Sequence, residues 1–243
     1  MSMGTVLTRL GTMNRYVSLA VAGGLAAAAL TLSGCGALGR SKHDQQSYEV
    51  AGTITALVVN GKSGRVTVMA GDGPVAVVER YEYTRDRPRT SHRTEGSTLV
   101  IEDAGCPGSR LARRCGTDFT ITVPAATAVT IDTGAGDVRL QGITARLLVR
   151  LDAGSITGTD LAGPAVVHSD TGEIELRFAR PPASVDASTD TGSARIYLPS
   201  DGRYDVDAKV DVGDVQVNVP VERSASNKVT VRADVGEVLV TSA

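Results

Sequence analysis

Apolar and polar residues alternate along the second half of the chain, and a glycine interrupts the alternation at regular intervals. The apolar positions lie seven and five residues before this glycine and two and four residues after it. Leu147 and Val149 precede Gly154 in this way, and Ile156 follows it. A period of two is typical of a strand with one buried face. Each unit therefore predicts a strand, a tight turn and a second strand.

The glycines define a regular repeat over residues 124–243, with intervals of 18, 18, 20, 21 and 23 residues. They are Gly136, Gly154, Gly172, Gly192, Gly213 and Gly236. A unit this short cannot bury its apolar face alone, whereas stacked units pair equivalent strands in parallel, about 4.8 Å apart. The repeat predicts an all-β fold: a parallel β-solenoid of 18–23-residue coils, right-handed because parallel crossovers prefer that hand. An antiparallel sandwich of hairpins is the alternative, which the regular spacing disfavours.

Residues 48–123 show the same pattern less regularly, and we predict a single β-solenoid domain over residues 48–243. Gly64 precedes Val66 and Val68 as the later glycines precede their strands. The segment 80–93, RYEYTRDRPRTSHR, is charged and contains a proline. Proline is confined to edges and connections of sheets, so this segment predicts a loop or extension at an exposed edge.

The triplet Asp-Thr-Gly, which is the signature of aspartic proteases, occurs at residues 132–134, 170–172 and 190–192. The last two copies occupy the turn of the repeat, where other units have Asp-Ala-Gly or Asp-Val-Gly, and the first copy is out of register. A protease needs two such carboxylates facing each other in one cleft. The variable middle residue instead indicates a turn, in which glycine supplies a positive φ and aspartate accepts backbone hydrogen bonds. We predict no catalytic residue there.

The turn aspartates would form one column along the stack. They are Asp152, Asp170, Asp190, Asp211 and Asp234. Neighbouring carboxylates at this spacing repel each other by roughly 1 kcal/mol in water. Our interpretation is that backbone N–H groups of the turns offset the repulsion, so that no metal and no cofactor is needed. Calcium bridging along the column is the weaker hypothesis, because the spacing of calcium-binding β-rolls is missing.

The first 34 residues have the features of a secretory signal peptide. Two arginines precede an apolar run from Val17 to Leu32, and no acidic residue occurs in this segment. A permanent membrane anchor is the weaker alternative, because the run is shorter than the roughly 20 residues that a spanning helix needs. Translation starts at either Met1 or Met13, since the residues from Met13 also have the form of a signal start.

Residues 32–35, Leu-Ser-Gly-Cys, resemble the bacterial lipobox. The resemblance implies that residues 1–34 are removed and that Cys35, acylated on its sulfur, becomes the N-terminus of the mature chain. Two or three acyl chains, such as palmitate, hold a protein firmly on a bilayer. We therefore expect a lipoprotein at the extracytoplasmic face of the cell membrane, with residues 35–47 as a flexible tether.

Two further cysteines, Cys106 and Cys115, are close in sequence. An exported chain can oxidise such a pair, and we predict a structural disulfide worth roughly 2–3 kcal/mol. A redox or metal role is the alternative, but there is no Cys-x-x-Cys motif and no neighbouring histidine cluster.

The segment FTITVPAATAVTIDTGAGDVRLQGI (119–143) and the units DAGSITG, DTGEIEL and DVGDVQV resemble the bacterial β-strand-repeat family of putative adhesins. The resemblance covers most of residues 50–243. It implies an envelope-exposed β-solenoid, and it supplies no active site.

These features favour a non-enzymatic binding or surface scaffold, with a cell-wall polymer or a surface protein as partner. The rival is a polysaccharide-acting β-helix enzyme, and a calcium-stabilised structural module is a further alternative. Enzymes of this kind gather carboxylates in a groove, whereas here the acids occur once per coil and His43, His92 and His168 are dispersed. The formal net charge of −2 and the export signal argue against nucleic acid as a partner.

Several arginines of the first half of the chain could contact anionic lipid headgroups or wall polymers. They are Arg80, Arg85, Arg87, Arg89, Arg93, Arg110, Arg113 and Arg114. Acidic residues are interleaved with them, so a solvated surface is the favoured interpretation.

Overall fold

The computed structural model describes residues 40–107 and 114–243, which form sixteen strands in one hydrogen-bonded sheet and contain no helix. The predicted all-β class is confirmed. No helix in this part of the chain is long and apolar enough to cross a membrane. The predicted signal peptide and Cys35 lie outside the described residues.

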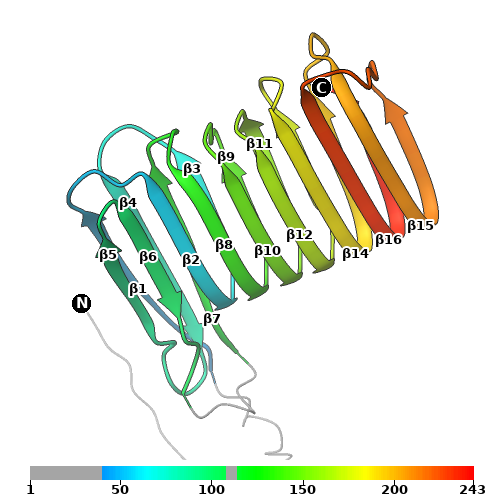
Figure 1. The fold of residues 1–243 in the computed structure, drawn as a ribbon. Helices are drawn as coiled ribbons and strands as arrows, with labels where there is room; N and C mark the ends of the chain where they lie inside the picture. Colours follow the sequence, from blue (N-terminus) through cyan, green and yellow to red (C-terminus); the bar gives the residue numbers. More distant parts are fainter. Residues whose placement is uncertain (1–39, 108–113) are drawn as a thin grey trace, which may run out of the picture. The chain divides into compact units, whose positions relative to one another are not determined.

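The middle of the fold is a stack of coils, each with one strand leading into the glycine corner and one leaving it (Figure 1). The strands that lead in are β2 (Ala56–Ser63), β8 (Ala128–Ala135), β10 (Leu147–Ala153) and β12 (Ala165–Thr171). Those that leave are β3 (Val66–Ala70), β9 (Val138–Gln141), β11 (Ile156–Leu161) and β13 (Ile174–Phe178). Three longer strands, β14 (Ser184–Leu198), β15 (Tyr204–Asn218) and β16 (Asn227–Ser242), run through the corner without a break.

Equivalent residues of successive repeats pair in parallel and in register. Leu147 lies between Val129 and Ala165 on one side of the coil. On the other side, Ile156 lies between Val138 and Ile174. The parallel pairing predicted for these repeats is confirmed, and the antiparallel sandwich is wrong for them. The right hand of the coil stays a prediction.

The core lies inside the stack, where the inward residues of the two strand columns meet. Leu147, Val149 and Leu151 of β10 are at most 1% exposed, while Arg150 between them faces solvent. Full burial of an aliphatic side chain stabilises the fold by about 1.5–3 kcal/mol. Burial of the inward residues of the period-two pattern is therefore the main source of the fold's stability.

The first part of the domain departs from the parallel prediction. Here β4 (Val75–Tyr83) pairs antiparallel with both β1 (Lys42–Val50) and β7 (Cys115–Val123). β5 (Thr90–Glu95) pairs antiparallel with β6 (Thr98–Asp103). A loop or extension was predicted for 80–93, and a loop over the whole segment is wrong, because the end of β4 and most of β5 fall in it. The exposed edge is confirmed, since β5 is the last strand at that end of the sheet.

The flexible tether predicted for residues 35–47 is wrong for residues 42–47. They belong to β1, in which Lys42 lies opposite Tyr83 and Val50 opposite Val75. Nearly all side chains of β1 are exposed, so the strand carries no apolar alternation. Backbone hydrogen bonds to β4 hold it instead.

The order of the last coils also differs from the sequence order. β16 pairs with β14 on one side and with β15 on the other. The C-terminal strand therefore lies inside the stack, and β15 forms its open end (Figure 1).

Candidate functional site

The glycine corners lie above one another along the whole stack. Seven glycines occupy them, with φ between +124° and +147°: Gly64, Gly136, Gly154, Gly172, Gly192, Gly236 and Gly213. A Cβ on Gly154 would lie 1.7 Å from the carbonyl oxygen of Gly136. Only glycine fits where one backbone passes this close to the next. The recurring Asp-x-Gly triplets are thus corners of the coil, and their glycines are accounted for by the turn.

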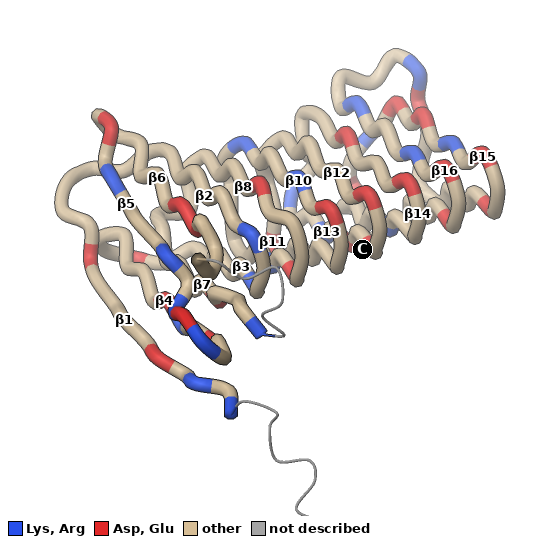
Figure 2. The backbone as a smooth tube through the Cα atoms, turned by 90° about the horizontal axis from the view of Figure 1, so that it is seen from below, with Lys and Arg blue, Asp and Glu red and all other residues tan. Residues whose placement is uncertain are grey.

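The corner aspartates form a column, but in an order different from that predicted. Since β16 lies between β14 and β15, Asp234 follows Asp190, and Asp211 is at the end. The carboxylates of this column are exposed. Figure 2 shows the acidic residues recurring from coil to coil along the stack.

The corner N–H groups do not hold these carboxylates in the way that the sequence suggested. The N–H of Gly136 donates to the carbonyl oxygen of Ala153, and that of Gly154 to Thr171, both at 2.9 Å. These donors therefore bind the next coil. The aspartate carboxylates remain at the surface, where they can meet a cation.

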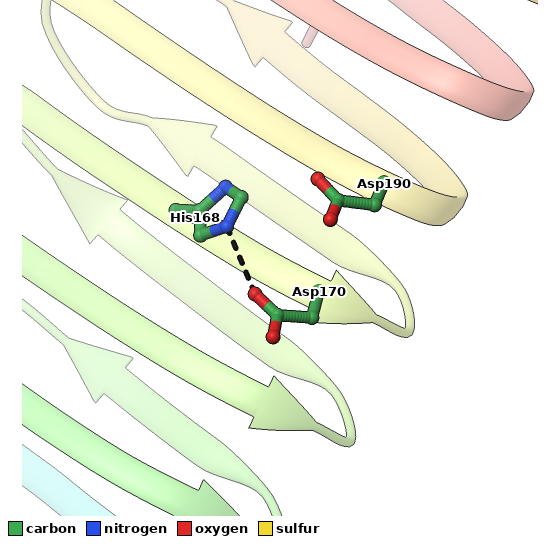
Figure 3. A group of neighbouring side chains, drawn as sticks. All are labelled: His168, Asp170 and Asp190. Carbon is green, nitrogen blue, oxygen red and sulfur yellow. Dashed lines mark hydrogen bonds and ion pairs between the residues drawn. The ribbon is translucent and has the colours of Figure 1, made fainter.

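One histidine joins this column. His168 and Asp170 lie two positions apart on β12, so both face outward, and Asp190 lies on the neighbouring coil (Figure 3). The Nε2 atom of His168 is 3.0 Å from Oδ1 of Asp170, and Nδ1 is 2.9 Å from the Ser188 hydroxyl. One ligand atom from each of His168, Asp170 and Asp190 lies within 4.8 Å of the others. Among the described residues, this is the group with the donor set of a metal site.

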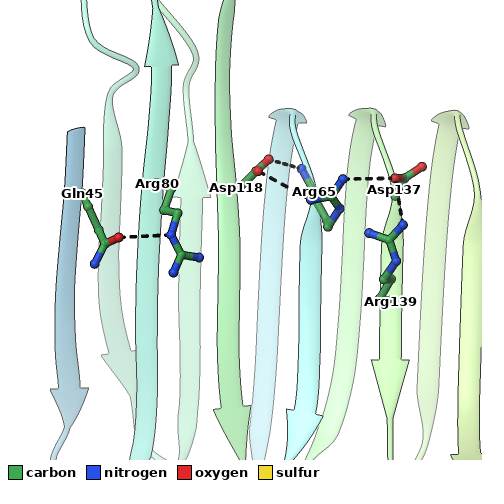
Figure 4. Close-up of polar contacts among 6 residues, drawn as sticks. All are labelled: Gln45, Arg65, Arg80, Asp118, Asp137 and Arg139. Atoms are coloured by element: carbon green, nitrogen blue, oxygen red, sulfur yellow. Dashed lines mark hydrogen bonds and ion pairs between the residues drawn. The ribbon is translucent and has the colours of Figure 1, made fainter. Parts of the chain in front are cut away.

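Several acids of a second column, directly after the glycines, form ion pairs with arginines. Asp137 is 3.3 Å from the guanidinium of Arg139 and 3.7 Å from that of Arg65, which also contacts Asp118 (Figure 4). A hydrogen bond from the Ser155 hydroxyl and the two guanidinium groups hold the pKa of Asp137 below its ordinary value. Arg195 lies between Glu173 and Glu237, at 3.6 and 3.8 Å. These acids are occupied as ion-pair partners and are poor candidates for calcium.

The arginines of the first half form pairs at the N-terminal end of the stack. Arg87 contacts Asp44 and lies over the Tyr81 ring, at 3.9 Å from its centroid. Arg93 contacts Glu95 and Glu102, and Arg114 contacts Glu82. The amide oxygen of Gln45 accepts a hydrogen bond from Arg80 (Figure 4). This pairing supports the interpretation of a solvated surface, while Arg110 and Arg113 lie outside the described residues.

A shallow groove of about 500 Å³ lies beside these arginines. His43, Arg80, Glu82, Arg114 and Cys115 are among its lining residues. Cys115 forms the predicted disulfide with Cys106, which the structure confirms. The two cysteines therefore have a structural role, because their disulfide links Cys106 to the first residue of β7.

A buried carboxylate lies beneath the same end of the stack. Glu79 is 0% exposed and accepts hydrogen bonds from the hydroxyls of Tyr48 (2.8 Å), Thr90 (2.6 Å) and Tyr81. Sequence reasoning missed this cluster. The only available signal was an acid at an inward position of the alternating segment VAVVERY.

The open end of the stack is the second candidate site. β16 is the only named strand that pairs with β15 in the described residues, and apart from a bridge between Tyr204 and Val221 the other row of its backbone groups has no strand partner there. Val212, Val215 and Val217 of this strand are 64%, 40% and 36% exposed. An exposed edge of this length with apolar side chains can accept a further strand.

This architecture defines an all-β, solenoid-like repeat protein whose candidate sites lie on its surface. The chain matches the Toastrack DUF4097 family over residues 52–241, and it belongs to this family.

Solved structures show related shapes at low sequence identity. A "putative cell adhesion protein" from Clostridium sporogenes is 14% identical, with a TM-score of 0.49 over 84% of this chain and 100% of that chain. A "putative adhesin" from Bacteroides fragilis is 16% identical, with a TM-score of 0.44 over 82% and 97%. A "putative lipid binding protein" from Parabacteroides distasonis is 10% identical, with a TM-score of 0.33 over 83% and 95%. No curated protein matches this sequence.

Proposed function

We propose that this chain is an exported, lipid-anchored surface scaffold that binds a partner without catalysis. In this proposal residues 1–34 are removed, Cys35 carries the lipid, and a right-handed β-solenoid of 18–23-residue coils projects from the extracytoplasmic face of the membrane. The lipobox resemblance supports the anchor. The membership of the Toastrack family supports the solenoid.

The observation that carries the binding function is the open end formed by β15. This strand is 15 residues long, turns through the corner at Gly213, and leaves both backbone groups and valines exposed. Proteins normally protect such an edge with charge, proline or a covering segment. An uncovered edge of this kind supports a partner that adds a strand to it.

The charge of β15 indicates the chemistry of that partner. The strand carries four aspartates against one lysine, at Asp205, Asp207, Asp211, Asp214 and Lys209. Asp205 and Asp207 form ion pairs with Lys228, Lys209 and Arg232, so Asp211 and Asp214 contribute most of the negative charge. Two copies of β15 brought edge to edge would oppose like charges, which destabilises cross-strand pairs. We infer that the occupant is an extended, basic segment of another surface protein.

Short peptides test this inference directly. We would measure the binding of a peptide that alternates valine with lysine, and of one that alternates valine with glutamate, to the full-length chain in detergent. The basic peptide is expected to bind, and the double variant V215K/V217K to weaken it at least tenfold. The matched control is R93A/E95A on β5, at the opposite end of the sheet, which should bind as wild type does. Equal binding of the acidic peptide, or self-association of the chain at its β15 end, would contradict the inference.

The anchor is tested separately, by mass spectrometry of the mature N-terminus. We expect an acylated cysteine as the first residue of the wild-type protein and an unacylated chain for Cys35→Ala. An uncleaved, unacylated wild-type protein would overturn the proposed localisation. Incubation with peptidoglycan and wall polysaccharides separates the binder from the enzyme, because release of fragments would favour the enzyme.

A further inference from the structure

We propose that His168, Asp170 and Asp190 form a binding site for zinc or a similar first-row divalent cation. The site lies on the corner column of the solenoid and involves neither the lipid anchor nor the β15 edge. It would fix a metal between two successive coils.

The site is a product of in-register stacking. His168 and Asp170 share the outer face of β12 because alternate residues of a strand point the same way. His168 pairs with Ser188 of β14, and the register continues to Thr171 beside Thr191, which puts Asp190 next to Asp170. The three donors therefore come from two strands, although Asp170 and Asp190 are 20 residues apart in sequence.

The donor atoms are already close to the spacing that a metal requires. They lie within 4.8 Å of one another, and Zn²⁺ binds imidazole nitrogen and carboxylate oxygen at about 2.0–2.2 Å. Small rotations of the two exposed aspartates would close the remaining distance. Three protein ligands leave room for a water molecule as the fourth.

Ser188 orients the histidine for this role. Its hydroxyl is 2.9 Å from Nδ1, while Nε2 faces Asp170. A hydrogen bond to one ring nitrogen fixes the ring and leaves the other nitrogen available, as the outer-sphere partners of metal-binding histidines do. The imidazole would bind the metal as the tautomer that carries its proton on Nδ1, where it can donate to the Ser188 hydroxyl, and Nε2 would be the ligand atom.

The same column shows why the site falls at these two coils. The position of His168 and Ser188 is taken by Arg150 on the preceding coil and by Arg232 on the following coil. Those coils therefore carry a permanent cation two positions before their corner aspartate, and Arg232 pairs with Asp207 of β15. At Asp170 and Asp190 the column offers a histidine and a serine, so a bound cation would relieve the carboxylate repulsion most effectively here.

The mixed donor set distinguishes zinc from calcium. Calcium requires six to eight oxygen ligands, and a histidine nitrogen does not serve it. Imidazole with carboxylates suits zinc, copper, nickel or cobalt. The proposal therefore differs from the calcium hypothesis of the sequence in two ways. The metal is a first-row transition metal, and it binds at two of the five aspartates instead of along all of them.

Calorimetric titration of the full-length chain with zinc chloride tests the proposal. The protein is purified in detergent without a histidine tag, and calcium chloride is titrated in parallel. We expect one equivalent of zinc with micromolar or tighter affinity and no displacement by calcium. H168A and D190N should each lower the affinity at least tenfold.

Matched controls separate this site from other zinc donors. H92A removes a histidine at the other end of the stack and should bind zinc as wild type does. R150A removes a positive charge in register with His168 and should not weaken zinc binding. The ring signals of the histidines in NMR spectra provide a readout that does not depend on the variants' folding, since those of His168 should shift first. Absence of zinc binding, wild-type affinity of H168A, or displacement of zinc by calcium would each overturn the proposal.

Discussion

The hydroxyl of Tyr48 donates a 2.8 Å hydrogen bond to the carboxylate of Glu79, and this contact joins β1 to β4. The hydroxyls of Tyr81 and Thr90 complete the coordination of the buried carboxylate. Burial, reinforced by the bond to Glu79, raises the pKa of Tyr48 above its ordinary value, so the tyrosine remains a neutral donor. This polar cluster attaches the outermost strands to the end of the stack.

Glu79→Ala should lower the free energy of unfolding by about 1–3 kcal/mol, because the hydroxyls lose their acceptor. Glu79→Gln keeps one acceptor oxygen and should cost less. Urea unfolding measures both. Glu82→Ala is the control on the same strand, because its exposed ion pair with Arg114 contributes at most about 1 kcal/mol. Equal losses for Glu79→Ala and Glu82→Ala would contradict the role of the cluster.

Gly154→Ala should destabilise the solenoid severely, by roughly 3 kcal/mol or more, since the new Cβ would overlap the backbone of the preceding coil. Gly73→Ala is a suitable control. Its φ is also positive, at +101°, but a Cβ there meets nothing within 4 Å. Its cost should be only the conformational one, about 1–2 kcal/mol. Thermal unfolding that ranks the two variants the other way would show that the corner contact is not what requires glycine.

The buried carboxyl group of Asp103 should make the free energy of unfolding depend on pH. Burial is the main cause that raises its pKa above the ordinary value. The folded protein therefore binds the proton more tightly than the unfolded chain, so this group stabilises most below its unfolded pKa, and the contribution is lost as pH rises through the folded pKa. Asp103→Asn should gain stability relative to wild type as pH rises from about 4 to 7 in urea unfolding.

Asp207 should give a pH dependence of stability opposite to that of Asp103. A hydrogen bond from Lys209 lowers its pKa, so its stabilising contribution is present above the unfolded pKa and disappears as pH falls through the folded one. Asp207→Asn should thus lose stability relative to wild type at neutral pH and approach it in acid. The same trend in both variants would refute the assignment for Asp103.

Removal of the disulfide by C106S/C115S should lower the free energy of unfolding by roughly 2–3 kcal/mol, because the short loop gains freedom in the unfolded chain. Dithiothreitol should lower the melting temperature of the wild type to that of the double variant. It should leave the melting temperature of the double variant unchanged. A reductant effect on the double variant would show that the loss has another source.

The corner glycines and the inward residues could be predicted from sequence because both follow a strict period. Val129, Leu147 and Ala165 share one offset from their glycines, and they lie side by side in the structure. The order of the last strands could not be predicted in this way. Val206 and Val229 have the same offset, so the pattern does not encode which of the two repeats pairs with β14.

β1 escaped prediction for a different reason. Its residues 42–47 are polar and exposed, and its place depends on backbone hydrogen bonds and on the distant Glu79. Hydropathy carries no signal for a strand of this kind. Tyr48 was assigned to the start of the fold, but its partner 31 positions away was not visible in the sequence.

Only part of the proposed metal-binding group could be predicted from the sequence. The spacing of His168 and Asp170 by two residues was available from a strand prediction, and Asp190 shares the repeat position of Asp170. Along the sequence, His168 is only one of three dispersed histidines. Comparing side chains down each column of the aligned repeats would have brought the three together.

The inner position of β16 has a consequence for biogenesis. β15 is synthesised before the strand that separates it from β14, so the chain cannot add its coils one by one in the order of translation. The first coils can assemble before β16 is made, but the final two cannot stack until residues 227–242 are present. A polypeptide that stops before residue 227 would leave β15 without its strand neighbour and could not attach that strand to the stack.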